Sequence, residues 1–183
     1  MKISILLLAA LTASGILHAE SVDIPVLYRN PAEVKTGQLQ AFGFYENDTR
    51  IVLAFQIKDL QKVMEDPKSS LSFYADADND LATGRYPKSR GWDFQMNVLL
   101  ERKIVSTMIK WNGKGQNFAI RGQYTLAVTG DLLFVSIRKS AIPGIEFKEQ
   151  FKFRTFPLRD NIRVDKRKTD GVFPEKFELP EDK

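Results

Sequence analysis

The chain has 183 residues, 43% of them hydrophobic and 11% aromatic, which is enough for one domain with a sizeable core. Its formal net charge is only +4, a mild excess that does not require a nucleic-acid partner. It contains no cysteine, which excludes disulfides, thiol nucleophiles and thiolate metal sites, and His18 is its only histidine.

The N-terminus has the pattern of a secretory signal peptide over residues 1–19. Lys2 supplies a positive start, an apolar run covers 3–11, and the segment ends in the small residue Ala19. We therefore expect cleavage after Ala19 and an exported protein of the bacterial periplasm or surface. No later segment approaches the ~20 apolar residues of a membrane span. Loss of His18 with this peptide would exclude a Ser-His-Asp triad and a His-ligated zinc or haem site.

The remaining sequence divides into three parts. Residues 20–37 form a leading segment with one short edge strand around 26–29, residues 38–157 form a single domain, and residues 158–183 form a charged, partly irregular and loosely packed tail. Hydrophobic alternation and turn residues predict strands at 38–46, 50–58, 71–75, 92–100, 104–111, 118–128, 132–138 and 150–156, with one helical turn at 60–64. The segment 118–128 reads as one strand or as two strands broken near Gly122.

These short strands, separated by turns and nearly free of helix, predict an antiparallel β-sandwich. Asn47-Asp48 lies between the first two strands of the domain and is a hairpin signal. Neither an internal repeat nor a second domain is visible in the sequence.

The stretch 76–84, Asp-Ala-Asp-Asn-Asp-Leu-Ala-Thr-Gly, places three aspartates at alternate positions. Their charges would repel one another in a folded loop unless a cation binds them, and calcium suits a flexible loop better than magnesium does. The candidate ligands are Asp76, Asp78, Asp80, the carbonyl of Ala82, and Asp93 from the next strand. The alternative is an acidic turn without an ion, because Asp and Asn favour turns through local hydrogen bonds alone.

Several short segments occur in an order that carries a family resemblance. They are the hairpin 44–55, the passage from Phe73 to Asp80, the pair Thr83-Gly84, then Gly91-Trp92-Asp93-Phe94, Trp111-Asn112-Gly113 and Ser140-Ala141-Ile142-Pro143-Gly144. Over residues 38–156 the chain resembles the carbohydrate-binding family-nine and DOMON-like β-sandwich domains of exported proteins. The resemblance implies a jelly-roll-like sandwich, often with structural calcium, that binds a ligand such as a sugar without transforming it.

A sugar ligand needs aromatic faces that stack on pyranose rings. The candidates in this sequence are Trp92, Trp111, Tyr86 and Tyr124, although each also suits a core or rim position of a sandwich. We expect a glycan or another surface ligand as the partner.

Two other functions remain as alternatives. Some relatives carry a b-type haem, and here its axial ligands would have to come from Met64, Met96, Met108 or a lysine; methionines on strands, however, usually fill core gaps. A glycan-active enzyme would need paired carboxylates, drawn from Asp76, Asp78, Asp80, Asp93 and Glu101. Carboxylates that bind a metal are poor acids and bases, so the sequence favours a non-catalytic, calcium-containing binding domain.

Overall fold

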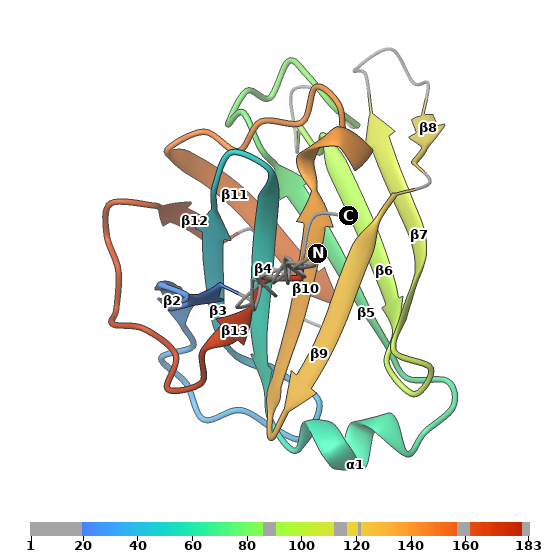
Figure 1. The fold of residues 1–183 in the computed structure, drawn as a ribbon, viewed down its shortest axis with the longest axis vertical. Helices are drawn as coiled ribbons and strands as arrows, with labels where there is room; N and C mark the ends of the chain where they lie inside the picture. The colour runs from blue at the N-terminus through green and yellow to red at the C-terminus, as the bar shows by residue number, and fades with distance from the viewer. Residues whose placement is uncertain (1–19, 86–90, 112–116, 121, 157–161, 181–183) are drawn as a thin grey trace, which may run out of the picture.

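A computed structural model describes residues 20–85, 91–111, 117–120, 122–156 and 162–180 (Figure 1). In chain order the elements are β1 (Ser21–Val22), β2 (Val26–Arg29), β3 (Leu39–Glu46), β4 (Arg50–Ile57), α1 (Leu60–Met64), β5 (Ser70–Asp76), β6 (Phe94–Leu99), β7 (Ile104–Trp111), β8 (Asn117–Ala119), β9 (Tyr124–Thr129), β10 (Leu132–Arg138), the 3-10 turn η1 (Lys139–Ala141), β11 (Gln150–Phe156), β12 (Ile162–Asp165) and β13 (Phe177–Glu178).

The strands form an antiparallel β-sandwich, as the sequence predicts. One sheet has five strands in the order β2-β3-β4-β10-β9, and the other has six in the order β12-β11-β5-β6-β7-β8. A separate two-stranded sheet joins β1 to β13. The described residues contain no helix long and apolar enough to cross a membrane.

The β3–β4 hairpin forms where the alternation and the Asn47-Asp48 signal place it. The side-chain oxygen of Asn47 accepts hydrogen bonds from the amides of Thr49 (3.0 Å) and Arg50 (2.8 Å), which holds the turn closed. The helical turn at 60–64 and the strands at 26–29, 104–111, 132–138 and 150–156 have the predicted bounds.

The segment 118–128 divides into two strands that belong to different sheets. The break lies near Gly122, where a Cβ atom would come within 2.7 Å of the Met108 side chain and 2.8 Å of the Ala141 side chain. Glycine therefore avoids a clash with Ala141 close to the point where the chain passes from one sheet to the other. β6 also begins later than predicted, because Trp92 pairs with Arg85 across the preceding loop instead of with β5.

Phenylalanine rings fill the space between the two large sheets. Phe42 from the five-stranded sheet lies 4.2 Å from Phe153 and 5.7 Å from Phe73 of the six-stranded sheet, measured between ring centroids. All three side chains are fully buried. Such rings contribute large apolar areas and fix the relative position of the sheets.

A second, smaller core covers the other face of the five-stranded sheet. Strand β4 is buried on both faces, so its apolar residues that point away from the main core need a cover. That cover comes from both ends of the described chain, with Ile24, Phe173 and Phe177 packed against the sheet. The expectation of a loosely packed tail is therefore wrong for residues 162–179, which include β12, β13 and the buried Phe173 and Phe177.

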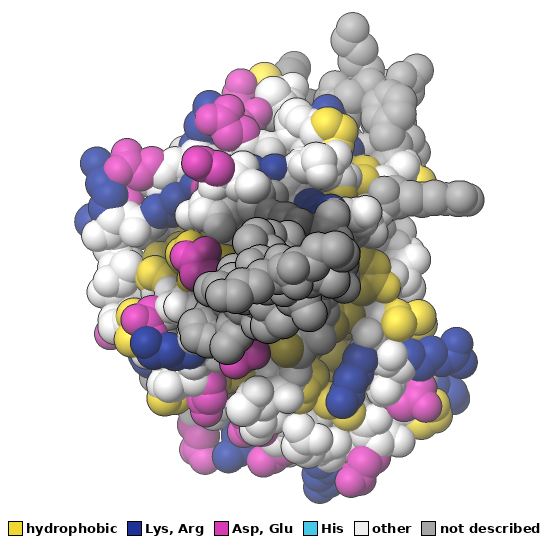
Figure 2. Space-filling view, viewed as in Figure 1, with side chains coloured by type: hydrophobic (Ala, Val, Ile, Leu, Met, Phe, Trp, Pro, Cys, Tyr) yellow, Lys and Arg dark blue, Asp and Glu magenta, His cyan; other side chains and the backbone are white. Residues whose placement is uncertain are grey.

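On the face seen in Figure 2, hydrophobic side chains gather near the centre, around the part drawn in grey. Lysines and arginines are interspersed with aspartates and glutamates toward the rim. This mixture of charges agrees with the small net charge of the chain.

Candidate metal centre and adjoining pocket

The candidate site lies at one end of the six-stranded sheet. β5 ends at Asp76, Asp93 immediately precedes β6, and β7 ends at Trp111. Because neighbouring strands of this sheet are antiparallel, the end of β5, the start of β6 and the end of β7 share one edge. The segment 144–148, which leads into β11, is joined to this edge by the amide of Lys148, which donates to the carbonyl of Ala77 (2.8 Å).

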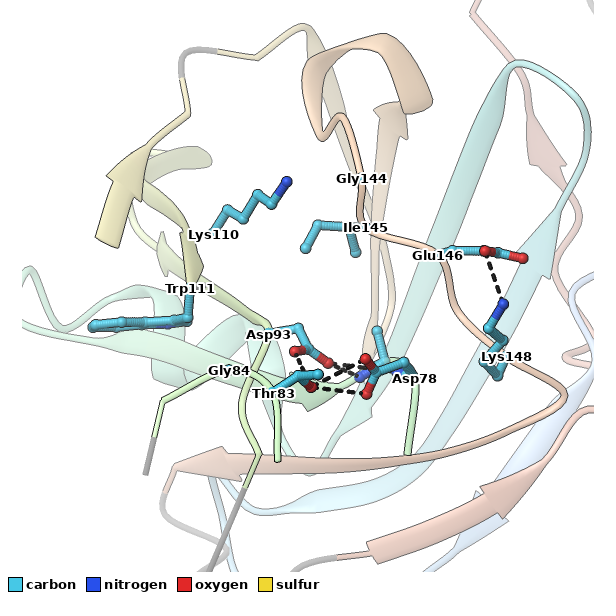
Figure 3. Close-up of a pocket in the computed structure, with 11 residues that line it drawn as sticks. Asp78, Thr83, Gly84, Asp93, Lys110, Trp111, Gly144, Ile145, Glu146 and Lys148 are labelled. Atoms are coloured by element: carbon cyan, nitrogen blue, oxygen red, sulfur yellow. Dashed lines mark hydrogen bonds and ion pairs between the residues drawn. The ribbon is translucent and has the colours of Figure 1, made fainter. Parts of the chain in front are cut away.

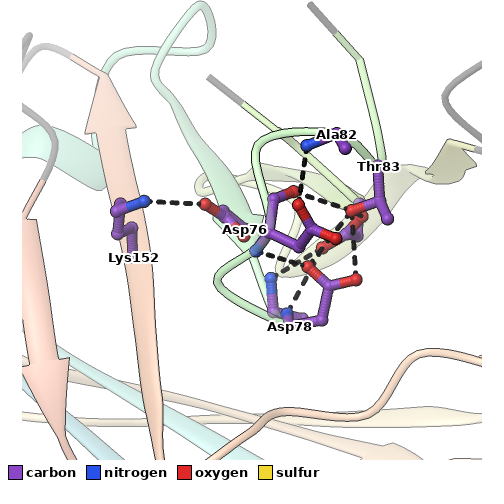
Figure 4. A network of polar contacts seen from close by, with 8 residues as sticks. Asp76, Asp78, Ala82, Thr83 and Lys152 are labelled. Atoms are coloured by element: carbon purple, nitrogen blue, oxygen red, sulfur yellow. Dashed lines mark hydrogen bonds and ion pairs between the residues drawn. The ribbon is translucent and has the colours of Figure 1, made fainter. Parts of the chain in front are cut away.

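Three carboxylates converge at this edge, and Figure 4 labels two of them, Asp76 and Asp78. Asp76, Asp78 and Asp93 each offer an oxygen within 4.8 Å of the others. Asp76 is fully buried and Asp93 is 8% exposed, whereas Asp78 is half-buried. This arrangement can hold a metal ion, since hard cations bind clustered carboxylate oxygens.

Asp93 organises the loop through both of its oxygens. Oδ2 accepts hydrogen bonds from the amides of Ala77 (2.8 Å) and Asp78 (3.4 Å), and Oδ1 accepts one from the hydroxyl of Thr83 (3.0 Å). Burial and then the charge of Asp78 raise the pKa of Asp93 to about 7, although these hydrogen bonds oppose the shift. Ionisation of these carboxylates therefore costs free energy, and a bound cation would reduce that cost.

The hydroxyl of Thr83 is shared by several acceptors. It lies 3.0 Å from Asp78 Oδ2, 3.1 Å from Asp78 Oδ1, 3.0 Å from Asp93 Oδ1 and 2.9 Å from the carbonyl of Asp80. A hydroxyl has one proton, so only one of these oxygens receives it at a time. The cluster therefore contains more acceptors than its own donors satisfy.

Asp76 is the most buried of the three carboxylates. Its Oδ2 accepts from the ammonium of Lys152 on β11 (3.1 Å), while its Oδ1 has no hydrogen-bond partner among the described residues. The amide of Asp80 donates to Asp78 Oδ1 (2.9 Å) and also helps to lower the pKa of Asp76. Burial raises the pKa of Asp76, with a further rise from Asp78, and Lys152 only partly offsets it. A buried carboxylate oxygen without a partner is costly.

Asp80 and Ala82 lie outside this trio. The exposed Asp80 side chain accepts a hydrogen bond from the amide of Ala82 (2.8 Å) within the turn. Asn79 has a φ of 56°, so the chain leaves the extended conformation before Asp80 and no longer alternates. Alternate spacing in the sequence consequently does not bring all three loop aspartates to one point.

Two glycines close the loop against the start of β6. Gly84 has a φ of 68°, and a Cβ there would lie 2.3 Å from the carbonyl oxygen of Trp92. Gly91 has a φ of 60°, and its Cβ would lie 2.8 Å from the carbonyl oxygen of Asp80. Glycine is required at both positions because the backbone segments on the two sides of the loop are in direct contact.

A pocket of about 410 Å³ opens beside the carboxylates (Figure 3). Asp78, Thr83 and Asp93 form one wall, and the remainder is lined by Lys110, Gly144, Ile145, Glu146 and Lys148. Trp111 lies at the margin, and its ring is directed away from Lys110 and Ile145. This volume is within the range of pockets that hold small molecules.

The aromatic residues predicted to contact a sugar lie in different parts of the fold. Trp111 lines the pocket, and the guanidinium of Arg85 lies 4.5 Å above its ring. Trp92 is only 2% exposed, and its ring centroid lies 6.0 Å from that of Tyr74, so it has no free face for a sugar. Tyr124 lies on β9 in the other sheet, half-buried against the main core. Tyr86 lies outside the described residues.

The methionines considered for haem and Glu101, considered for catalysis, lie outside the acidic cluster. Met96 and Met108 face each other across β6 and β7 in the main core, and Met64 lies on α1. Glu101 follows the end of β6 that lies away from the acidic cluster, and it is exposed.

Sequence reasoning did not identify Thr83, Lys110, Lys148 or Lys152 as members of the site. The antiparallel register places Lys152 directly opposite Asp76, although the two residues are 76 positions apart in the sequence. No local pattern reveals such a pair. Thr83 could have been identified from the sequence, because it lies within the aspartate loop itself.

The described residues do not include any metal-type cluster of acidic side chains other than this trio. Comparisons of the chain with protein families, with curated proteins and with solved structures each found no match.

Proposed function

We propose that this chain is an exported, non-catalytic β-sandwich that binds calcium through Asp76, Asp78 and Asp93 and a glycan in the adjoining pocket. The observation that carries the proposal is the buried Oδ1 of Asp76, which lacks a partner within a cluster of three carboxylates. The signal-peptide pattern of residues 1–19 supports export.

Calcium fits the donors better than other cations do. The three side chains offer only oxygen, without the nitrogen or sulfur ligands that favour zinc or copper. Calcium accepts six to eight oxygens in flexible geometry, so backbone carbonyls and water can complete a set that three carboxylates begin. Lys152 already compensates one of the three charges, leaving an excess close to that of a divalent ion.

The pocket supports a glycan ligand through its mixed lining. Thr83, Lys110 and the carboxylates supply polar groups, and Trp111 supplies an aromatic group at the margin. Asp78 and Asp93 both accept hydrogen bonds from Thr83, and Asp93 also accepts one from the backbone amide of Ala77, which supports a structural role for the two carboxylates. Binding without chemistry is the function that these contacts favour.

The metal part is tested by thermal unfolding of the purified protein in EDTA and in calcium. Binding to the folded state alone contributes about 2.7 kcal/mol at a hundredfold excess over Kd. For a domain of this size, we expect calcium to raise Tm by about 5–10 °C. Asp78→Asn should remove most of that rise, whereas Asp170→Asn, which changes an exposed aspartate paired with Arg29, should retain it. An equal Tm of the parent in EDTA and in calcium would contradict the proposal.

The glycan part is tested by titrating cello-, xylo- and chito-oligosaccharides and their acidic derivatives into the calcium-loaded protein. Trp111→Ala should weaken binding at least about tenfold through loss of the aromatic contact, while Trp111→Phe should retain most of the affinity. Tm in calcium reports that each variant is folded. Absence of binding to every sugar, or full affinity in Trp111→Ala, would sink the glycan assignment.

A further inference from the structure

We infer that the pocket selects glycans that carry a carboxylate, and that it does so only when a divalent cation occupies the acidic cluster. This inference rests on the proposed function and deepens it. The ligand class that it names is a uronate-bearing oligosaccharide, and its principal contact is Lys110.

Lys110 presents a positioned ammonium group at the pocket. It extends from β7 toward Gly144, and its Nζ donates to the carbonyl of Pro143 (2.9 Å) (Figure 3). A Cβ at residue 144 would lie 2.6 Å from Nζ, so Gly144 leaves the space that the ammonium fills. The Pro143 carbonyl uses one of three ammonium protons, and Lys110 forms no ion pair among the described residues.

Lys148, the other lysine of the pocket, forms an ion pair, whereas Lys110 does not among the described residues. Its ammonium pairs with Glu146 on the same segment at 2.9 Å. That pair places equal and opposite charges at the rim and gives no net attraction for an anion. Lys110 is thus the cation in the lining that an incoming carboxylate would meet.

The opposite wall determines when an anion can enter. Among the described residues, the lining carries three carboxylates, Asp78, Asp93 and Glu146, against two ammonium groups, Lys110 and Lys148, for a formal net charge of −1 when all five groups are ionised. A divalent cation at the cluster changes that sum to +1. Behind this wall, Asp76 and Lys152 compensate each other. Occupancy of the metal site therefore reverses the sign of the pocket.

A carboxylate is the anion that suits this charge. It carries one negative charge, which matches the net +1, and it accepts charge-assisted hydrogen bonds from the two remaining Lys110 protons. A sugar attached to that carboxylate would extend toward Trp111, which lies at the margin of the same pocket. Acidic sugars combine both groups in one residue.

The experiment compares a matched pair of ligands, xylotriose and xylotriose substituted with glucuronic acid, by calorimetric titration. In calcium we expect the acidic sugar to bind about tenfold more tightly than the neutral one, and in EDTA we expect that preference to vanish. Lys110→Met should also lower the preference to near unity while keeping the calcium-dependent rise in Tm. Lys176→Met, which removes an exposed lysine paired with Asp23, should behave as the parent does.

Several results would overturn the inference. Equal binding of both sugars in calcium would refute it and leave the proposed glycan function standing. Binding of neither sugar would also refute it, and the wider panel of sugars then decides the glycan function. A preference that persists in EDTA, or in folded Lys110→Met, would also refute it. Acetate, titrated as a competitor, tests the source of the carboxylate. If acetate alone displaces the acidic sugar at similar concentration, the pocket recognises free carboxylates instead of glycans.

Discussion

Thr83 shows how one side chain can hold an acidic loop together. Its single hydroxyl proton faces oxygens of Asp78, Asp93 and Asp80 at 2.9–3.1 Å. In the absence of a cation it is a neutral donor to a cluster that contains an excess of acceptors. With a cation present, the metal would satisfy the carboxylates, and the hydroxyl would matter less.

This role predicts a calcium-dependent effect of Thr83→Val. In EDTA, loss of the hydroxyl should lower the free energy of unfolding by about 1–3 kcal/mol, because buried carboxylate oxygens lose their donor. In saturating calcium the loss should be smaller, and Thr83→Ser should resemble the parent in both conditions. Urea unfolding monitored by tryptophan fluorescence measures these differences. Equal stability of Thr83→Val and the parent in EDTA would show that the hydroxyl does not stabilise the loop.

At the scale of elements, the five-stranded sheet depends on the chain segments that cross its outer face. Phe173 is 2% exposed and lies in the second core with Ile24 and Phe177. Gly43 on β3 makes room for it, since a Cβ there would lie 2.6 Å from the Phe173 ring. The segment after β12 is thus a structural part of the sandwich.

Shortening the Phe173 side chain should destabilise the whole domain. Phe173→Ala should lower the free energy of unfolding by about 3–5 kcal/mol, since it opens a cavity against the sheet. The adjacent Val172 has a side chain that is 53% exposed, and Val172→Ala should change the stability by no more than about 0.5 kcal/mol. Denaturant unfolding of the two variants provides the comparison. Similar small losses in both would mean that the cover contributes little.

At the scale of the whole molecule, Glu46 connects parts that belong to both sheets. It lies at the end of β3 and accepts from Lys139 (2.8 Å), next to β10, and from Lys166 (2.6 Å), next to β12. Lys166 also donates to the carbonyl of Phe147. Burial alone would raise the pKa of Glu46, but the hydrogen bonds and charges of the two lysines outweigh it and lower the pKa.

The lowered pKa predicts how stability changes with pH. A carboxylate whose pKa is lower in the folded state stabilises that state above its unfolded pKa of about 4.3, and this contribution disappears as the pH falls through the folded value. Glu46→Gln should thus be less stable than the parent at pH 7 by about 1 kcal/mol. The gap should close toward pH 3. Urea unfolding at both pH values measures the difference, and a gap that does not depend on pH would contradict the ionic role of Glu46.

The local features of this chain were predictable because they depend on neighbours in the sequence. Alternation placed β3, β4, β7, β10 and β11, and turn residues placed the β3–β4 hairpin. The density of aspartates in 76–84 identified the loop, and the buried trio includes two of its members together with Asp93. The same reasoning also included Asp80, because it did not anticipate the positive φ of Asn79.

The sequence by itself determined the all-β class, most strand positions and the acidic loop, since each follows from residues within a few positions of one another. Tertiary structure decided that Lys152 faces Asp76, that Lys110 and Trp111 share a pocket with the loop, and that Phe173 covers the second core. These contacts join residues from separate strands and loops. They depend on strand order and register, which are set by the packing of both sheets and not by any local pattern.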